Sequence, residues 1–170
     1  VRSEVAEGVV EMKEKHGVTP GIAVVLVGDN PVSAIYVRNK DRAAREAGIV
    51  AEVFRLPVEA TQDEVLAQVS EINEDPRFHG MIVQLPLPDQ VREQTVIEAI
   101  HPDKDVDGLH PANMGRLMAG MPRFVPGTPA GVQQMLIRSG YDPSGQHVVI
   151  CGRSNIVGKP LANLLMQRPE

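Results

Sequence analysis

Short apolar runs that alternate with helical stretches are the feature that most restricts how this chain can fold. The runs are "GIAVVLVG" (21–28), the weaker "AEVFRLP" (51–57) and "GMIVQLPLP" (80–88). Short, almost continuous apolar segments flanked by glycine and proline are typical of parallel strands that are covered on both faces. The order strand, helix, strand, helix, strand predicts an α/β fold with a mostly parallel sheet. Ligands of such folds bind beyond the carboxyl ends of the strands.

The charge and composition favour a small-molecule ligand over nucleic acid or a membrane. The 170 residues carry a net charge of −5 with both signs interspersed, so we predict no nucleic-acid partner and no polybasic membrane patch. No apolar run approaches the ~20 residues of a membrane span. The single cysteine, Cys151, fits a reducing compartment, and we predict a cytoplasmic protein. The five histidines lack ligand spacing, so no metal site is predicted.

A stretch punctuated by proline and glycine, "AGMPRFVPGTPAGV" (119–132), is the best candidate for a domain boundary. We predict a catalytic α/β domain over 1–125 and the beginning of a Rossmann-type domain over 126–170. The second region contains a helical stretch and then "QHVVICG" (146–152), which predicts a further buried strand. One strand and one helix do not complete such a domain, so we expect this sequence to be a fragment.

Lys40 stands out within the helical stretch "SAIYVRNKDRAAREAG" (33–48). At about 100° per residue, most charged side chains of this stretch gather on one face, whereas Lys40 lies within about 40° of Tyr36 and among alanines. We expect that stripe to face inward. An ammonium group there loses hydration and needs a partner or a polar cavity. Lys40 is therefore a candidate catalytic or ligand-binding residue. The alternative is a lysine whose stem packs on the alanines while its head reaches water.

Gln84 interrupts the apolar run "GMIVQLPLP" at the end of the predicted strand. A buried amide there needs partners for both its carbonyl and its NH₂ group. The Gln84 side chain either forms hydrogen bonds with neighbouring backbone groups or is part of a ligand-binding site. Its position favours a site, because Lys40 is expected to emerge on the same side.

The acidic loop is compatible with two kinds of site. Asp103, Asp105, Asp107 and Gly108 match the opening of an EF-hand calcium loop, but its twelfth position is Met114 where a bidentate Glu is required. Calcium is therefore disfavoured. The loop is either a solvated turn or a site in which one carboxylate accepts hydrogen bonds from a ring N–H and an amino group of a ligand.

The segment "CGRSNIVGKP" (151–160) follows the last predicted strand and opens a helix, so its backbone N–H groups could receive a pyrophosphate. Its glycine spacing differs from G-x-G-x-x-G, and an ordinary strand–turn–helix connection remains the alternative. Arg153 and Ser154 could hold a phosphate monoester, which suits the 2′-phosphate of NADP better than the bare ribose of NAD.

Five motifs, in their order and spacing, resemble those of the bifunctional methylenetetrahydrofolate dehydrogenase/cyclohydrolase family. They are "VGDNPVSAIYVRNK", "GMIVQLPLP", "HPDKDVDGLHPANMGRL", "PGTPAGV" and "GRSNIVGKP". The resemblance covers nearly the whole chain. It implies a catalytic domain and a Rossmann-type NADP domain that face each other across a cleft, usually in a homodimer. It also implies tetrahydrofolate derivatives as substrates: oxidation of 5,10-methylenetetrahydrofolate with NADP, then hydrolysis of the methenyl product to 10-formyltetrahydrofolate.

The resemblance implies roles for residues of the first domain. By their place in the motifs, Tyr36 stacks on the folate ring and Lys40 is catalytic. Gln84 orients the lysine, and Val83 and Leu85 flank it along the substrate.

The resemblance also implies roles in the later motifs. Asp107 binds the ring nitrogens of the pterin. Gly152, Arg153 and Ser154 bind the cofactor, and Gly158 allows a close approach.

Two departures from the family pattern are visible. Gly127 stands where the family often has cysteine. The rest of the Rossmann domain, with a later Gly-rich loop that contacts folate, is expected after Glu170, and the first part of the catalytic domain before Val1. Two other functions remain open at this point: an NADP-dependent dehydrogenase of another small substrate, and a non-catalytic α/β assembly module in which Lys40 merely reaches water.

Overall fold

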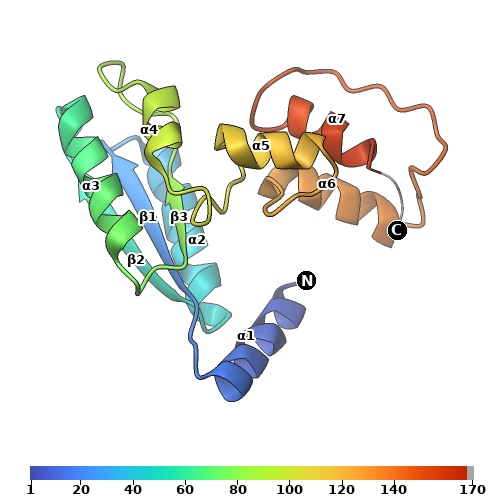
Figure 1. Cartoon of the computed structure of the whole chain (residues 1–170), viewed down its shortest axis with the longest axis horizontal. Coiled ribbons are helices and arrows are strands. Elements are labelled where there is room, and N and C mark those ends of the chain that lie inside the picture. The colour runs from blue at the N-terminus through green and yellow to red at the C-terminus, as the bar shows by residue number, and fades with distance from the viewer. Residues whose placement is uncertain (168–170) are drawn as a thin grey trace. The chain divides into compact units, whose positions relative to one another are not determined.

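The computed structural model describes residues 1–167, which Figure 1 shows as a ribbon. The chain divides into two compact units, Val1–Lys104 and Asp105–Glu170.

The first unit alternates helices and strands. Its elements, in chain order, are α1 (Arg2–His16), β1 (Gly21–Val27), α2 (Pro31–Glu46), β2 (Val50–Leu56), α3 (Gln62–Glu74), β3 (Gly80–Val83) and α4 (Glu93–Ala99). The three predicted strands are therefore present, and the predicted α/β class is confirmed.

The sheet of the first unit is parallel, with β1 between β2 and β3. Gly21 pairs with Val50, and Ile22 pairs with Gly80. The chain moves from β1 to β2 and then crosses back over β1 to reach β3. Right-handed crossovers in opposite directions place their helices on opposite faces of a sheet, and Figure 1 shows α2 and α3 on the two sides of β1.

β1 is buried along almost its whole length because helices cover both of its faces. One face contributes to a core with β3, α3 and the segment around α4. Members of this core include Ala23, Val25, Val65, Val69, Ile72, Met81 and Val96. The apolar runs recognised in the sequence thus form the centre of the unit, as expected for a parallel sheet covered on both faces.

Side-chain caps define the starts of the two crossover helices. Asn30 Oδ1 accepts hydrogen bonds from the backbone N–H groups of Val32 and Ser33, with Pro31 at the first turn of α2. Thr61 and Glu64 form a reciprocal capping box at the start of α3. The hydrogen bonds from Thr61, the backbone one first, hold the pKa of the Glu64 carboxyl below its usual value.

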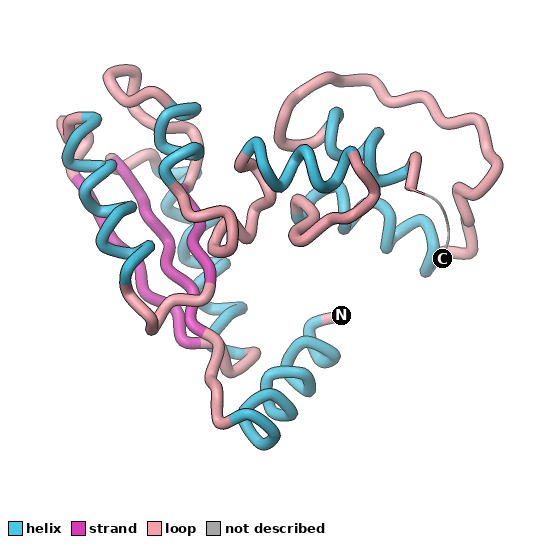
Figure 2. Tube along the Cα trace, viewed as in Figure 1, coloured by secondary structure: helices cyan, strands magenta, loops and turns pink. Residues whose placement is uncertain are grey.

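The second unit contains α5 (Pro111–Met118), α6 (Gly127–Arg138) and α7 (Gly158–Leu165). A long loop, drawn pink in Figure 2, joins α6 to α7. The helices expected after residues 126 and 157 are present. The acidic loop region also forms α5, which the sequence patterns had not indicated.

The strand expected over 146–152 is not formed, and that prediction is wrong for this structure. Val148 and Val149 are 44% and 73% exposed. A strand needs a neighbour that pairs with its N–H and C=O groups, and among the described residues none pairs with this segment. An apolar sequence alone therefore does not produce a strand here.

The predicted boundary after residue 125 stays a prediction. The contacts within the chain divide it between Lys104 and Asp105 instead, at the entry of the acidic loop.

Candidate active site

Lys40 and Gln84 form a direct pair in the first unit. The Lys40 Nζ atom donates a hydrogen bond of 3.2 Å to Gln84 Oε1. Lys40 is half-buried in α2, and Gln84 is half-buried directly after β3. The sequence-based expectation that these two side chains emerge on the same side of the sheet is confirmed.

Gln84 makes two hydrogen bonds in addition to the one from Lys40. Its backbone N–H donates to Val25 O at 2.9 Å, which continues the pairing of β3 with β1. Its side-chain Nε2 donates to Leu85 O at 2.7 Å. Because Nε2 is occupied by a carbonyl, Oε1 is left facing Lys40, and this settles the orientation of the amide.

Tyr36 does not lie where the helical stripe predicted it. Its side chain is 58% exposed, whereas Ser33 and Val37 are the buried residues of α2. The buried face of the helix is centred on these two positions, and Lys40 lies one turn beyond them at its edge. The expectation of an inward-facing Tyr36 is therefore wrong. An exposed phenol ring one turn before Lys40 is available to stack on a flat ligand.

Val83 and Leu85 flank Gln84 in different environments. Val83 is 5% exposed and belongs to the apolar core, while Leu85 is half-buried and packs against that core. The Leu85–Pro86 peptide bond is cis. Beyond the carboxyl ends of the strands, a hollow of about 290 Å³ is lined by 27–30, Val58 and 86–88.

The acidic loop places its three aspartates in three environments. Asp103 is exposed, Asp105 is buried and Asp107 is half-buried. Gly108 follows with φ of 66°, and a Cβ there would lie 3.1 Å from Pro126 Cδ. Asp107, the predicted pterin-binding residue, thus stands in a turn that requires glycine at the next position. Among residues 1–167, no group of His, Cys, Asp or Glu side chains is arranged to hold a metal ion.

The glycine-containing loop before α7 is tightly folded. A Cβ on Gly158 would lie only 2.4 Å from Gly152 O, so the helix start and the loop approach each other too closely for any side chain. Ser154 Oγ accepts hydrogen bonds from Val157 N at 3.1 Å and Gly158 N at 3.3 Å. Two N–H groups expected to face a pyrophosphate are therefore bonded to Ser154 instead.

Arg153 and Ser154 remain suited to a phosphate monoester. Both residues are exposed, and the Ser154 hydroxyl keeps its own proton for donation after accepting two N–H groups. The fit of this loop to a dinucleotide rests on these two side chains and on the glycine contact.

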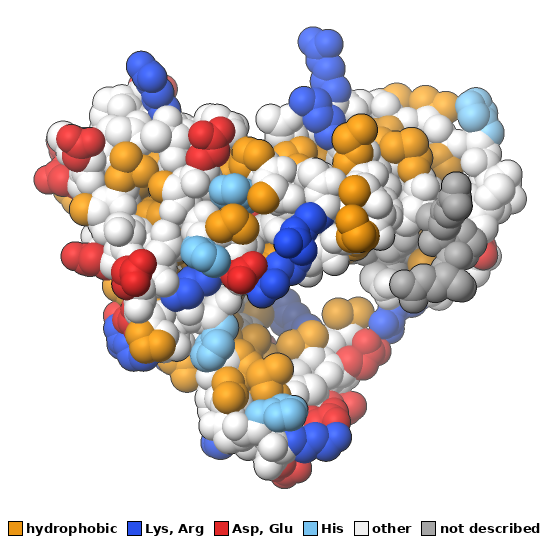
Figure 3. All heavy atoms as spheres, in the orientation of Figure 1, with side chains coloured by type: hydrophobic (Ala, Val, Ile, Leu, Met, Phe, Trp, Pro, Cys, Tyr) orange, Lys and Arg blue, Asp and Glu red, His pale blue; other side chains and the backbone are white. Residues whose placement is uncertain are grey.

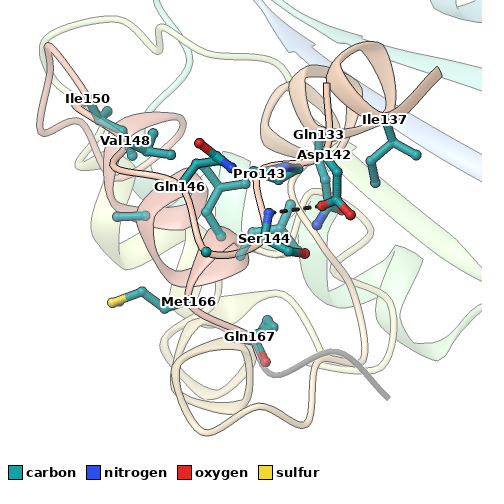
Figure 4. A pocket seen from close by; sticks show the side chains of 14 residues that line it. Gln133, Ile137, Asp142, Pro143, Ser144, Gln146, Val148, Ile150, Met166 and Gln167 are labelled. Atoms are coloured by element: carbon teal, nitrogen blue, oxygen red, sulfur yellow. Dashed lines mark hydrogen bonds between the residues drawn. The ribbon is translucent and has the colours of Figure 1, made fainter. Parts of the chain in front are cut away.

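A larger pocket of the second unit contains none of the predicted site residues. It has a volume of about 790 Å³ and lies between α6, the following loop and α7 (Figure 4). On its wall, Ser144 N donates to Asp142 Oδ1 at 2.9 Å, and hydrogen bonds from Ser144 hold the pKa of Asp142 below its usual value. Its other lining is mainly apolar and amide side chains, so it has the character of an uncovered core.

On the face shown in Figure 3, positive and negative side chains are interspersed. No helix among the described residues combines the length and the apolar character needed to cross a membrane.

Comparison with known proteins connects both units to one family. Residues 1–107 match the family described as tetrahydrofolate dehydrogenase/cyclohydrolase, catalytic domain. Residues 126–169 match its NAD(P)-binding domain.

Curated relatives named bifunctional protein FolD are similar over almost the entire chain. The protein from Streptococcus pneumoniae serotype 4 is 50% identical over 168 residues, which are 99% of this chain and 59% of the relative. The protein from Parvibaculum lavamentivorans is 53% identical over 167 residues, 98% of this chain and 56% of the relative. The chain thus spans somewhat more than half the length of these relatives.

Solved structures agree. The bifunctional enzyme FolD from Campylobacter jejuni has a TM-score of 0.93 at 43% identity, covering 97% of this chain and 58% of that one. The enzyme from Trypanosoma brucei, described as complexed with NADP cofactor and inhibitor, has a TM-score of 0.92 at 34% identity, covering 96% and 56%. The chain therefore belongs to the tetrahydrofolate dehydrogenase/cyclohydrolase family.

Proposed function

We propose that the complete protein oxidises 5,10-methylenetetrahydrofolate with NADP and hydrolyses the methenyl product to 10-formyltetrahydrofolate, as an enzyme of one-carbon metabolism. The hydrogen-bonded pair of Lys40 and Gln84 carries this proposal. It supplies a half-buried amine, oriented by an amide, in a chain of this family.

Substrate binding is assigned to the side chains that the family motifs indicate. The exposed ring of Tyr36 offers a flat apolar surface to the pterin. The Asp107 carboxylate accepts hydrogen bonds from pterin ring nitrogens, and Leu85 borders the substrate beside Gln84. Val83 supports this edge from the core.

The oxidation depends mainly on positioning. NADP, when bound, accepts the hydride that leaves the methylene bridge. The lone pair of a pterin nitrogen drives this departure, so the chain supplies no obligatory base. Tyr36 and Asp107 fix where the bridge lies, and positioning of reacting atoms is itself a large contribution to rate.

The hydrolysis depends on proton transfer. In its neutral form, the Lys40 amine takes a proton from the water whose oxygen bonds to the methenyl carbon, and gives that proton to the pterin nitrogen when the bond between this nitrogen and the carbon breaks. The hydroxyl proton of the adduct leaves to solvent as the formyl group forms. Gln84 Oε1 accepts one N–H of the Lys40 amine, and the bond from Gln84 Nε2 to Leu85 O keeps this acceptor in place.

Cofactor selection is assigned to the loop before α7. The guanidinium of Arg153 and the hydroxyl of Ser154 hold the 2′-phosphate, which favours NADP over NAD. Gly152 and Gly158 keep the loop backbone close to the helix start. We further propose a homodimer and a cytoplasmic location, with the catalytic domain extending to residue 125 and the cofactor domain beginning at 126.

The test is an absorbance assay on the complete gene product. Methylenetetrahydrofolate with NADP should yield NADPH together with methenyltetrahydrofolate, and added methenyltetrahydrofolate should decay without cofactor. NADPH formation only with other small substrates would support a different dehydrogenase. The absence of both activities in a folded protein would support the non-catalytic assembly module.

A further inference from the structure

The Asp105 carboxylate is the most deeply buried charged group in the loop that carries Asp107. Its side chain is 1% exposed. Oδ1 accepts a hydrogen bond from Leu109 N at 3.2 Å, and Oδ2 accepts one from His110 N at 2.8 Å and one from Asn113 Nδ2 at 2.8 Å. Burial of a carboxylate is tolerated when N–H groups surround it in this way.

The three donors all follow Asp107 in the chain, whereas Asp105 precedes it. The carboxylate therefore closes the backbone into a loop around Asp107 and Gly108. Gly108 N also donates to Asp105 O at 3.1 Å, which tightens the same turn.

The exit of this loop is fixed by the start of α5. His110 Nδ1 accepts a hydrogen bond from Ala112 N at 3.1 Å and caps the helix. Because Asp105 binds the backbone N–H of this capping residue, the loop and the helix start form one hydrogen-bonded block.

The entry of the loop is fixed as well. Lys104 Nζ donates to Ile72 O at 2.9 Å and to Asp75 O at 2.8 Å, at the C-terminal end of α3. Lys104 O accepts from Met81 N of β3 at 2.7 Å. A cation at a helix C-terminus is favoured by the helix dipole and bonds the last carbonyl groups. The residue directly before Asp105 is thus tied to two elements of the first unit.

We infer that Asp105 is a positioning residue for Asp107, and that it acts on folate binding without touching the substrate. The inference rests on the proposed function, in which Asp107 binds the pterin. Asp105 is too deeply buried to contact a ligand, but its three hydrogen bonds determine the backbone course around Asp107.

The experiment uses Asp105→Asn in the complete gene product. An amide keeps the size of the side chain but presents an NH₂ group to N–H donors, so at least one of the three bonds is lost. We expect the KM for methylenetetrahydrofolate to rise by about tenfold, the scale on which charge-assisted hydrogen bonds act. The kcat value and the KM for NADP should change much less. Asp103→Asn, an exposed aspartate of the same loop, is the matched control and should leave all three values unchanged.

Coupling to Asp107 separates positioning from general destabilisation. In an Asp107→Asn background, adding Asp105→Asn should raise the folate KM by less than about twofold, because the effects of residues that act as one unit are not additive. Additive increases, or an unchanged KM in Asp105→Asn alone, would overturn the inference. If Asp105→Asn does not fold, Asn113→Ala removes a single donor, and an unchanged folate KM in that folded variant would count equally against it.

The outcomes for the two proposals are distinguishable. Absence of both folate activities in the unmutated protein contradicts the proposed function. Normal activity, with a raised KM in Asp107→Asn and not in Asp105→Asn, contradicts only the positioning role.

Discussion

The Nζ atom of Lys40 lies 3.2 Å from Oε1 of Gln84, across 44 positions of sequence. The pair exists because β1 and β3 are adjacent in the sheet while α2 packs on one side of it. Gln84 N bonds Val25 O of β1, so the position of the amide follows directly from the strand register. The proposed catalytic amine is therefore oriented by the fold itself.

Replacing Lys40 with methionine tests the proton transfer. Lys40→Met keeps most of the side-chain bulk and removes the ammonium, so folding should survive. Cyclohydrolase activity should fall by roughly 10²-fold or more, the usual scale for general acid–base catalysis. Dehydrogenase activity should fall less, because Tyr36 and Asp107 still position the substrate.

The two activities are measured by decay of methenyltetrahydrofolate and by formation of NADPH. Lys13→Met, at an exposed lysine of α1, is the control. If Lys40→Met hydrolyses methenyltetrahydrofolate at nearly the wild-type rate, the terminal amine of Lys40 is merely solvated and has no catalytic role.

Replacing Arg153 with alanine tests cofactor selection. Arg153→Ala should weaken NADP binding by on the order of 1.5–3 kcal/mol, the contribution of a charged hydrogen bond, and should leave NAD almost unchanged. Steady-state KM values for the two cofactors provide the measurement. Equal losses for NADP and NAD would rule out contact with the 2′-phosphate.

The chain of 170 residues by itself should not bind NADP with micromolar affinity. A dinucleotide lies across the carboxyl ends of neighbouring parallel strands, and the described residues of the second unit contain no strand. Isothermal titration calorimetry on the purified 170-residue chain checks this. A micromolar dissociation constant would show that Arg153, Ser154 and the glycine contact suffice without a sheet.

Replacing Thr61 with alanine tests the capping box of α3. Thr61→Ala should destabilise the first unit by about 1 kcal/mol, as is typical for loss of an N-cap. Urea unfolding followed by far-UV circular dichroism gives the free energy of unfolding. Ser70→Ala on the exposed face of the same helix is the control and should have a much smaller effect.

The capping box also predicts a pH dependence. The pKa of the Glu64 carboxyl is lowered in the folded chain by its hydrogen bonds from Thr61. Its contribution to stability is therefore fully present above the pKa of the unfolded chain and is lost as pH falls through the folded value. Thr61→Ala should reduce this loss in acid. An identical pH profile for both proteins would contradict the assignment.

The elements that could be predicted are those in which local pattern and final environment agree. β1, β2 and β3 lie where the apolar runs occur, and the pairing of Lys40 with Gln84 follows from the rule that places ligands at strand ends. The capping box of α3 is likewise a local feature, because Thr61 and Glu64 are only three positions apart.

Other features depend on partners that are distant in sequence. Helical periodicity located the stripe around Lys40 but misplaced Tyr36, because the angular width of a buried face depends on what packs against it. The apolar segment at 146–152 has strand composition without a pairing partner. Burial of Asp105 could not be distinguished from exposure of Asp103, because both are aspartates in one polar loop.

The amide at position 84 has opposite chemistry at its two ends, and this restricts which residue can replace it. One end receives an N–H from Lys40 while the other gives an N–H to Leu85 O. A glutamate would turn a carboxylate oxygen against the Leu85 carbonyl, and its negative charge would hold the lysine in the protonated form, which cannot accept a proton from water. A methionine would fill the volume but would form neither hydrogen bond. A polar but uncharged side chain that both donates and accepts keeps the lysine in place without fixing it as the protonated half of an ion pair.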